Sequence, residues 1–121
     1  MKSYTSLEQS KKLAEILPLE SADMCFVNDG TAIKIDANSY NVRKLMWKDY
    51  VVEVIPCWGL AALLEIIRKP TALDLLIDGR GYRCHCTDKS EGKFYGTDDY
   101  CDNAIDACIE IIEKLYEQKL L

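Results

Sequence analysis

The sequence predicts an α+β fold: two α-β-β units and then a C-terminal helix, with the helices packed on one face of an antiparallel sheet made from the two hairpins. Two observations carry this prediction. A helical segment that ends at a proline and is followed by two short apolar runs around a turn occurs twice, and a third amphipathic segment closes the chain. Each α-β-β unit is too small to bury its helix alone, so we expect one α+β domain over residues 1–121.

The first predicted helix covers residues 7–17. Thr5 and Ser6 are each followed three residues later by a glutamate or glutamine, which gives two overlapping capping boxes. Pro18 disfavours helical geometry at the preceding residue, so the helix is expected to end there.

The first hairpin is predicted from residues 24–27 and 31–36, which flank an Asn-Asp-Gly turn at 28–30. Residues 40–55 are rich in β-branched and aromatic side chains and predict further strand structure. A polar break near 48–49 divides this segment into two expected strands.

The second helix is predicted over residues 58–69, opened by Pro56 and ended by Pro70. It is apolar on nearly every side, so it is expected to be enclosed by the chain or covered by a partner. The second hairpin is predicted from residues 73–77 and 82–87.

Residues 88–99 contain glycine, serine and several charges, and we expect an exposed loop there. The last helix is expected to start at Asp102 or Asn103. Its core stripe follows helical spacing: Ile105, Cys108, Ile109, Ile112 and Tyr116.

Charge and composition exclude several classes of protein. The net charge of -5 argues against a duplex nucleic-acid binder, because such proteins concentrate basic residues against the phosphates. No apolar run approaches the roughly 18 residues of a membrane span, and the N-terminus has no signal-peptide core, so a cytoplasmic location is expected. The six cysteines are therefore expected to be reduced and buried.

Three segments, 6–18 with 21–24, 56–64 and 102–108, are similar to a family of small proteins that recur in phages and prophage-like elements of gut Bacteroidetes. Where that family often has serine after the tryptophan, this chain has Gly59. The resemblance implies a mobile-element setting, and it brings no activity and no catalytic residue with it.

Cys84, His85 and Cys86 form the sharpest local candidate for a metal site, and Cys101 or Cys108 could complete four zinc ligands. On a strand, however, the two cysteines share one face and the histidine points to the other. The pattern therefore favours two core thiols and a surface histidine, and no cofactor is predicted.

Catalysis by a cysteine needs a base beside it. His85 is the single histidine of the chain, so any dyad, for example with Cys101, must use it. No local signature supports such a dyad, and we predict that the protein is not an enzyme.

A basic and aromatic cluster offers an alternative function. Arg43, Lys44, Trp47 and Lys48 could stack single-stranded bases and meet their phosphates. The other interpretation is a sheet with Trp47 in the core and solvated basic side chains around it.

The second helix offers a candidate interface, because Leu60, Leu63, Leu64 and Ile67 form one apolar stripe. Monomeric proteins usually avoid such an exposed patch, and a twofold homodimer is the common way to cover it. The alternative is that the chain itself surrounds the helix.

These observations together predict a non-enzymatic accessory protein of a phage or mobile element that binds another, unidentified protein. The alternatives are weak single-stranded nucleic-acid binding and a small zinc-stabilised domain.

Overall fold

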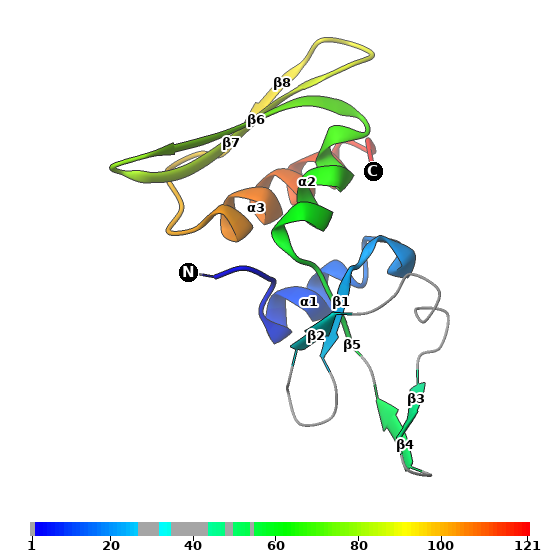
Figure 1. Cartoon of the computed structure of the whole chain (residues 1–121). Helices are drawn as coiled ribbons and strands as arrows, with labels where there is room; N and C mark the ends of the chain where they lie inside the picture. The colour runs from blue at the N-terminus through cyan, green and yellow to red at the C-terminus, as the bar shows by residue number, and fades with distance from the viewer. Residues whose placement is uncertain (1, 27–31, 35–43, 48–49, 54) are drawn as a thin grey trace. The chain divides into compact units, whose positions relative to one another are not determined.

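The computed structural model describes residues 2–26, 32–34, 44–47, 50–53 and 55–121 (Figure 1). It contains helices and antiparallel strands, which confirms the α+β class. The predicted order of helix, hairpin, helix, hairpin and helix is also present, and further strands follow each hairpin. The chain divides into two compact units, which are described separately below.

The N-terminal unit covers Tyr4–Ala62. Its elements are helix α1 (Leu7–Leu13), a 3-10 turn (Leu19–Ser21), β1 (Met24–Phe26), β2 (Ala32–Lys34), β3 (Lys44–Trp47), β4 (Tyr50–Glu53), β5 (Ile55–Cys57) and the start of α2 (Leu60–Arg68). In one antiparallel sheet β1 lies between β2 and β5, and β3 pairs with β4 in a second sheet. The first predicted hairpin is confirmed as β1 with β2, and β3 with β4 gives the two strands expected on either side of residues 48–49. The predicted turn at 28–30 and the predicted break at 48–49 themselves lie outside the described residues.

Pro56 does not open a helix, as the sequence predicted, but lies in β5 opposite Cys25. The strand is at the edge of its sheet among the described residues, and an edge strand tolerates the missing N–H of proline. The next residues, Cys57 and Trp58, are fully buried. The helix therefore starts later than predicted, at Leu60.

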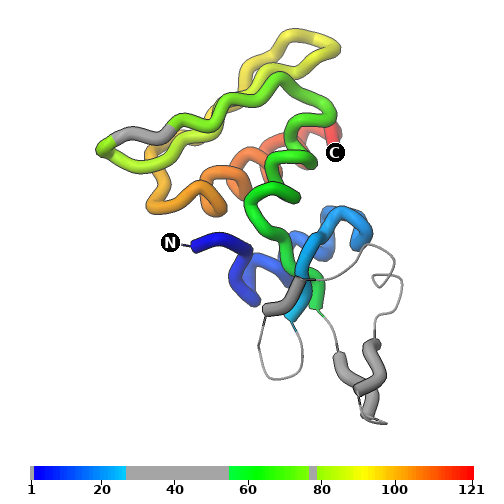
Figure 2. The backbone as a smooth tube through the Cα atoms, viewed as in Figure 1, coloured from blue at the N-terminus to red at the C-terminus, as the bar shows by residue number. Residues whose placement is uncertain are grey.

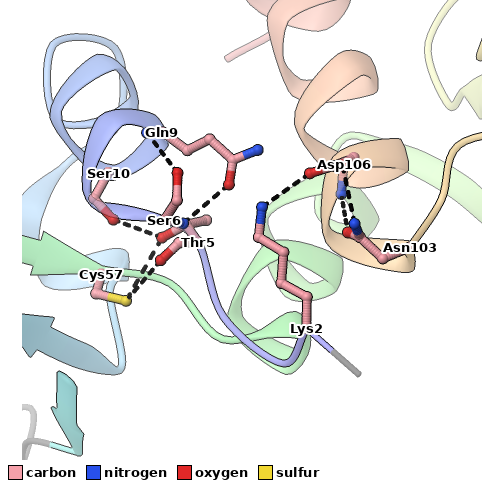
Figure 3. A network of polar contacts seen from close by, with 8 residues as sticks. All are labelled: Lys2, Thr5, Ser6, Gln9, Ser10, Cys57, Asn103 and Asp106. Atoms are coloured by element: carbon pink, nitrogen blue, oxygen red, sulfur yellow. Dashed lines mark hydrogen bonds and ion pairs between the residues drawn. The ribbon is translucent and has the colours of Figure 1, made fainter.

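The start of α1 shows which of the two capping boxes forms (Figure 3). Ser6 is the N-cap: its Oγ accepts from the Gln9 N–H at 3.2 Å, and Gln9 Oε1 accepts from the Ser6 N–H at 2.9 Å. Thr5 is instead fully buried, with its Oγ1 2.7 Å from Ser10 Oγ. The same Oγ1 accepts from the Trp58 N–H at 3.1 Å. Thr5 thus ties the helix start to the segment after β5.

Replacing Thr5 with valine is expected to lower the free energy of unfolding of the N-terminal unit by about 2 kcal/mol. Valine has the same shape, but it leaves the Trp58 N–H and the Ser10 hydroxyl without their partner. Urea denaturation followed by Trp fluorescence measures the loss. The comparison variant is Ser6→Ala, which removes an exposed cap and should cost about 1 kcal/mol. Equal small losses in the two variants would contradict the role of Thr5 as a tie between the two segments.

The C-terminal unit comprises Leu63–Leu121 together with the first residues of the chain. It contains the rest of α2, β6 (Thr71–Asp78), β7 (Gly81–Asp88), β8 (Phe94–Gly96) and α3 (Ala104–Glu117). The three strands form an antiparallel sheet in the order β6-β7-β8. Figure 2 shows β6 and β7 as one long hairpin, which confirms the second predicted hairpin.

The two hairpins do not share one sheet in the described residues, although a common sheet was expected. The first hairpin takes β5 as its third strand and the second takes β8. Each unit thus completes a three-stranded sheet from its own segment of chain, and a three-stranded sheet with a buried face needs no strand from elsewhere.

Residues 88–99 are not simply the exposed loop that the sequence predicted, because they contain β8. Asp88 is buried and orders the turn before this strand: its Oδ1 accepts from the N–H and the hydroxyl of Ser90, both at 2.8 Å. These hydrogen bonds lower the pKa of the Asp88 carboxyl. After the strand, Thr97 is buried and its N–H donates to the Cys84 carbonyl at 3.1 Å.

The last helix begins as predicted, with Asn103 as its N-cap (Figure 3). Asn103 Oδ1 accepts from the Asp106 N–H at 2.9 Å, and Lys2 Nζ lies 3.1 Å from Asp106 Oδ1. The predicted core stripe of α3 is buried at its first four positions, and Tyr116 is 45% exposed. The helix packs on β7 and β8, so it covers one face of the sheet (Figure 1).

Candidate functional site

Side chains alternate across β7 between a buried face and an outer face. Cys84 and Cys86 are buried on the side covered by α3, whereas Arg83 and His85 are only partly buried. This confirms that the two cysteines share one face and that His85 points to the other. The sheet therefore presents polar and apolar side chains on the face away from the core.

The thiols are poorly suited to metal binding or nucleophilic attack. A hydrogen bond with Cys108, together with burial, raises the pKa of Cys84, and burial raises the pKa of Cys86. Burial and then the nearby Glu110 carboxylate raise the pKa of Cys101. A thiol with a raised pKa stays protonated at neutral pH, whereas metal binding and attack both require the thiolate. No group of three or more His, Cys, Asp or Glu side chains in the described part of the chain could hold a metal ion.

The outer face is assembled from all three strands, as the register shows. We define it by the residues that the alternation places there: Ala72, Asp74 and Leu76 of β6, Arg83, His85 and Thr87 of β7, and Phe94 and Gly96 of β8. Two large apolar side chains on it are exposed, Phe94 by 61% and Leu76 by 43%.

Phe94 is held in place by an edge contact with His85, whose ring centroid lies 5.2 Å away at 65°. Gly96 makes this contact possible. A Cβ at Gly96 would lie 3.1 Å from both the His85 Cδ2 and the Phe94 Cε1 atoms. The absence of a side chain at this position lets the two rings meet over the sheet.

Arginines gather beside one end of the outer face. The guanidinium carbons of Arg80 and Arg83 lie 4.7 Å and 5.3 Å from the centre of the Tyr100 ring. One Arg83 amine also donates to the Thr97 carbonyl at 2.9 Å. Arg83 Nε and His85 Nε2, however, are buried atoms without a hydrogen-bond partner in the described part of the chain. Such unmet groups carry a desolvation cost.

The four candidate nucleic-acid residues lie in or beside the hairpin of β3 and β4 in the sequence, and only two of them are among the described residues. Arg43 and Lys48 lie outside the described residues. Lys44 and Trp47 lie in β3, where they pair with Glu53 and Tyr50 of β4.

The apolar stripe of α2 is largely used by the chain itself. Leu63 and Ile67 have no exposed surface, so they are not available to a second copy, while Leu60 and Leu64 are half-buried. The homodimer therefore stays a prediction, and Leu63 and Ile67 are no longer part of its predicted interface.

Of the predicted zinc ligands, Cys84 and Cys86 are core thiols, and Cys101 forms a β-bridge with Tyr82.

Sequence reasoning did not identify the outer face as a site. Its signal was the alternation in residues 82–87, where cysteines alternate with arginine, histidine and threonine. Phe94 was hidden because it falls in a segment expected to be a loop.

No helix in the described part of the chain is long and apolar enough to cross a membrane. Comparison of the chain with models of known protein families, with curated proteins and with solved structures gave no match.

Proposed function

We propose that this chain is a non-enzymatic accessory protein of a phage or mobile element and that it binds another protein through the outer face. The observation that carries the proposal is Phe94, an aromatic side chain that is 61% exposed although it lies in a strand and is fixed against His85. Aromatic and arginine side chains supply most of the energy at protein interfaces. A side chain already held in place also loses little entropy when a partner covers it.

The chemistry of the cysteines supports a binding role over catalysis. His85 lies on the face opposite Cys84 and Cys86, so neither of these thiols can form a dyad with it. All six cysteines are free and five are buried, which fits a reducing compartment such as the cytoplasm. The mobile-element setting rests on the three similar segments of the sequence.

Replacing Phe94 with alanine is expected to reduce capture of the protein partner about tenfold or more, since anchor residues of this kind contribute about 2 kcal/mol. Immobilised wild-type protein and the variant are compared in a pull-down from host cells, quantified by mass spectrometry. The stability of the variant should be nearly unchanged, because the side chain is mostly exposed.

Tyr116→Ala is the matched control, because this tyrosine is also exposed but lies on α3, away from the outer face. It should retain the partner. Capture of the same proteins by all three forms would contradict the proposal. So would turnover of a nucleotide, peptide or ester by pure protein that His85→Ala abolishes.

The same variants separate protein binding from binding of single-stranded nucleic acid. Aromatic and basic side chains together can stack bases and meet phosphates, and such binding weakens steeply with salt. Salt-sensitive binding of oligonucleotides that is lost in Phe94→Ala would assign the outer face to nucleic acid instead of protein.

A further inference from the structure

Strand β6 has an open edge, and the hydrogen bonds of β7 show which residues line it. Alternate residues of β7 turn their main-chain groups away from β6: Tyr82 N–H donates to the Cys101 carbonyl at 3.0 Å, Cys84 accepts from Thr97 at 3.1 Å, and Asp88 donates to Lys93 at 2.8 Å. In an antiparallel ladder the residues between them, Arg83 and His85, must turn their main-chain groups toward β6.

The partners of Arg83 and His85 on β6 are Leu76 and Asp74. The N–H and C=O groups of Leu76 and Asp74 are therefore hydrogen-bonded to β7. The residues that alternate with them, Leu73 and Leu75, point their N–H and C=O groups away from β7. In the described part of the chain β6 has no second strand neighbour. Leu73 and Leu75 thus present unpaired donors and acceptors along one edge, as edge strands do.

The side chains along this edge alternate in chemistry. Leu73 and Leu75 are half-buried and lie on the face that carries Cys84 and Cys86. Asp74 lies between them on the outer face, is exposed, and makes no ion pair within the described residues. A strand added at this edge would meet Asp74 at a non-hydrogen-bonded position, where side chains on facing strands come closest.

We infer that β6 is completed by an extended segment of the partner protein that alternates apolar with basic residues. Its apolar side chains would continue the row of Leu73 and Leu75, and a lysine or arginine would face Asp74. Its main chain would pair with the open edge, as in other complexes formed by strand addition. The inference rests on the proposed function, in that it names the kind of segment by which the partner protein would be held.

A second copy of β6 is a poorer occupant of the same edge. The strand carries two aspartates and no basic residue, and each copy of the chain has a net charge of -5. Facing carboxylates on neighbouring strands repel each other. A basic strand is attracted to the edge by the same charge that opposes self-pairing.

The test uses a short peptide that alternates lysine with valine, labelled for fluorescence anisotropy, and the full-length chain. Leu75→Pro removes the N–H at the open edge and leaves the hydrogen bonds between β6 and β7 intact, since the Leu75 N–H points away from β7. It should weaken peptide binding about tenfold relative to Leu75→Ala, which loses the same side chain and keeps the N–H. Circular dichroism checks that both variants fold.

An exposed substitution keeps the inference testable even if Leu75→Pro does not fold. Asp74→Lys should weaken binding of the lysine peptide about fivefold, the size of one surface ion pair, and should create a preference for the matching glutamate–valine peptide. Wild-type protein should prefer the lysine peptide, and the preference should shrink as salt is raised.

Equal binding of both peptides by wild type and Asp74→Lys, or unchanged binding in folded Leu75→Pro, would overturn the inference. A doubled mass in light scattering that Leu75→Pro returns to 13.8 kDa would also overturn it, in favour of a second copy as the occupant. Phe94 lies on β8, across β7 from this edge, so Phe94→Ala should leave peptide binding unchanged. Failure of the peptide test with a positive pull-down therefore removes the inference and leaves the proposed function standing.

Discussion

Above pH 9, in the presence of reductant, the free energy of unfolding of each unit is expected to fall by up to about 3 kcal/mol for each further pH unit, because each unit holds two buried thiols whose pKa is raised. These are Cys25 and Cys57 in the N-terminal unit and Cys84 and Cys86 in the C-terminal unit. Burial raises the pKa of Cys25, Cys57 and Cys86. The pKa of Cys84 is raised mainly by its hydrogen bond with Cys108 and secondly by burial.

The free energy of unfolding falls as the pH rises because the folded chain holds the thiol protons more tightly than the unfolded chain does. A raised pKa means that the folded chain keeps the thiol proton at a pH where the unfolded chain has lost it. The contribution to stability is complete below the ordinary thiol pKa of 9.0 and is lost as the pH rises toward the folded value. Domains of this size have about 5–15 kcal/mol of stability in total, so a loss of this kind is large enough to be measured by denaturation.

Urea denaturation between pH 7 and pH 10.5 measures this slope. Cys86→Ala should reduce the slope by about 1.4 kcal/mol per pH unit, the share of one proton, whatever its effect at neutral pH. Cys101→Ser is the control, because that thiol is partly exposed and should change the slope less. A stability that stays flat to pH 10.5 in the wild type would show that the buried thiols ionise as easily as free ones.

The parts of the fold that the sequence predicted are those whose signals are local. The Asn103 cap and the helical stripe after it define α3, and Ser6 with Gln9 defines the start of α1. The hairpins needed only two apolar runs and a short turn. Local signals of this kind act within one or two turns of chain and do not depend on what packs elsewhere.

The parts that were missed depend on distant residues. Pro56 resembles a helix start until Cys25 is known to lie opposite it in a sheet. Phe94 resembles a loop residue until Thr87 is known to pair with it. Thr5 and Ser6 are equivalent as caps in the sequence, and only the approach of Trp58 decides between them. Non-local pairing, which local sequence patterns do not contain, settles each of these cases.

The same distinction applies to the candidate site. The split of Cys84 and Cys86 from His85 follows from strand alternation and could be predicted. The outer face could not, because it exists only when β8 brings Phe94 beside His85. The open edge of β6 could not be predicted either, because the residues that line it are fixed by the hydrogen bonds between β7 and the segment after β8.

Gly81→Ala is expected to destabilise the C-terminal unit by about 3 kcal/mol. Gly81 starts β7 with a φ of +129°, a conformation that residues with a side chain rarely adopt. A Cβ there would also lie 2.6 Å from the Cys101 carbonyl oxygen, which is main chain and cannot rotate away. That carbonyl accepts the Tyr82 N–H at 3.0 Å, so relief of the clash would break the bridge that holds the segment after β8 against β7.

The neighbouring Gly79 provides a matched control, because it lies in the same turn and a Cβ there meets nothing within 4 Å. Gly79→Ala should therefore change stability by less than about 1 kcal/mol. Urea denaturation followed by circular dichroism measures both variants, and amide hydrogen exchange at Tyr82 and Cys101 reports the bridge directly. Faster exchange at those two amides in Gly81→Ala alone is the expected result. Equal stability of the two variants would mean that β7 can start without the close approach of Cys101, and that the bridge between Tyr82 and Cys101 does not fix this end of the outer face.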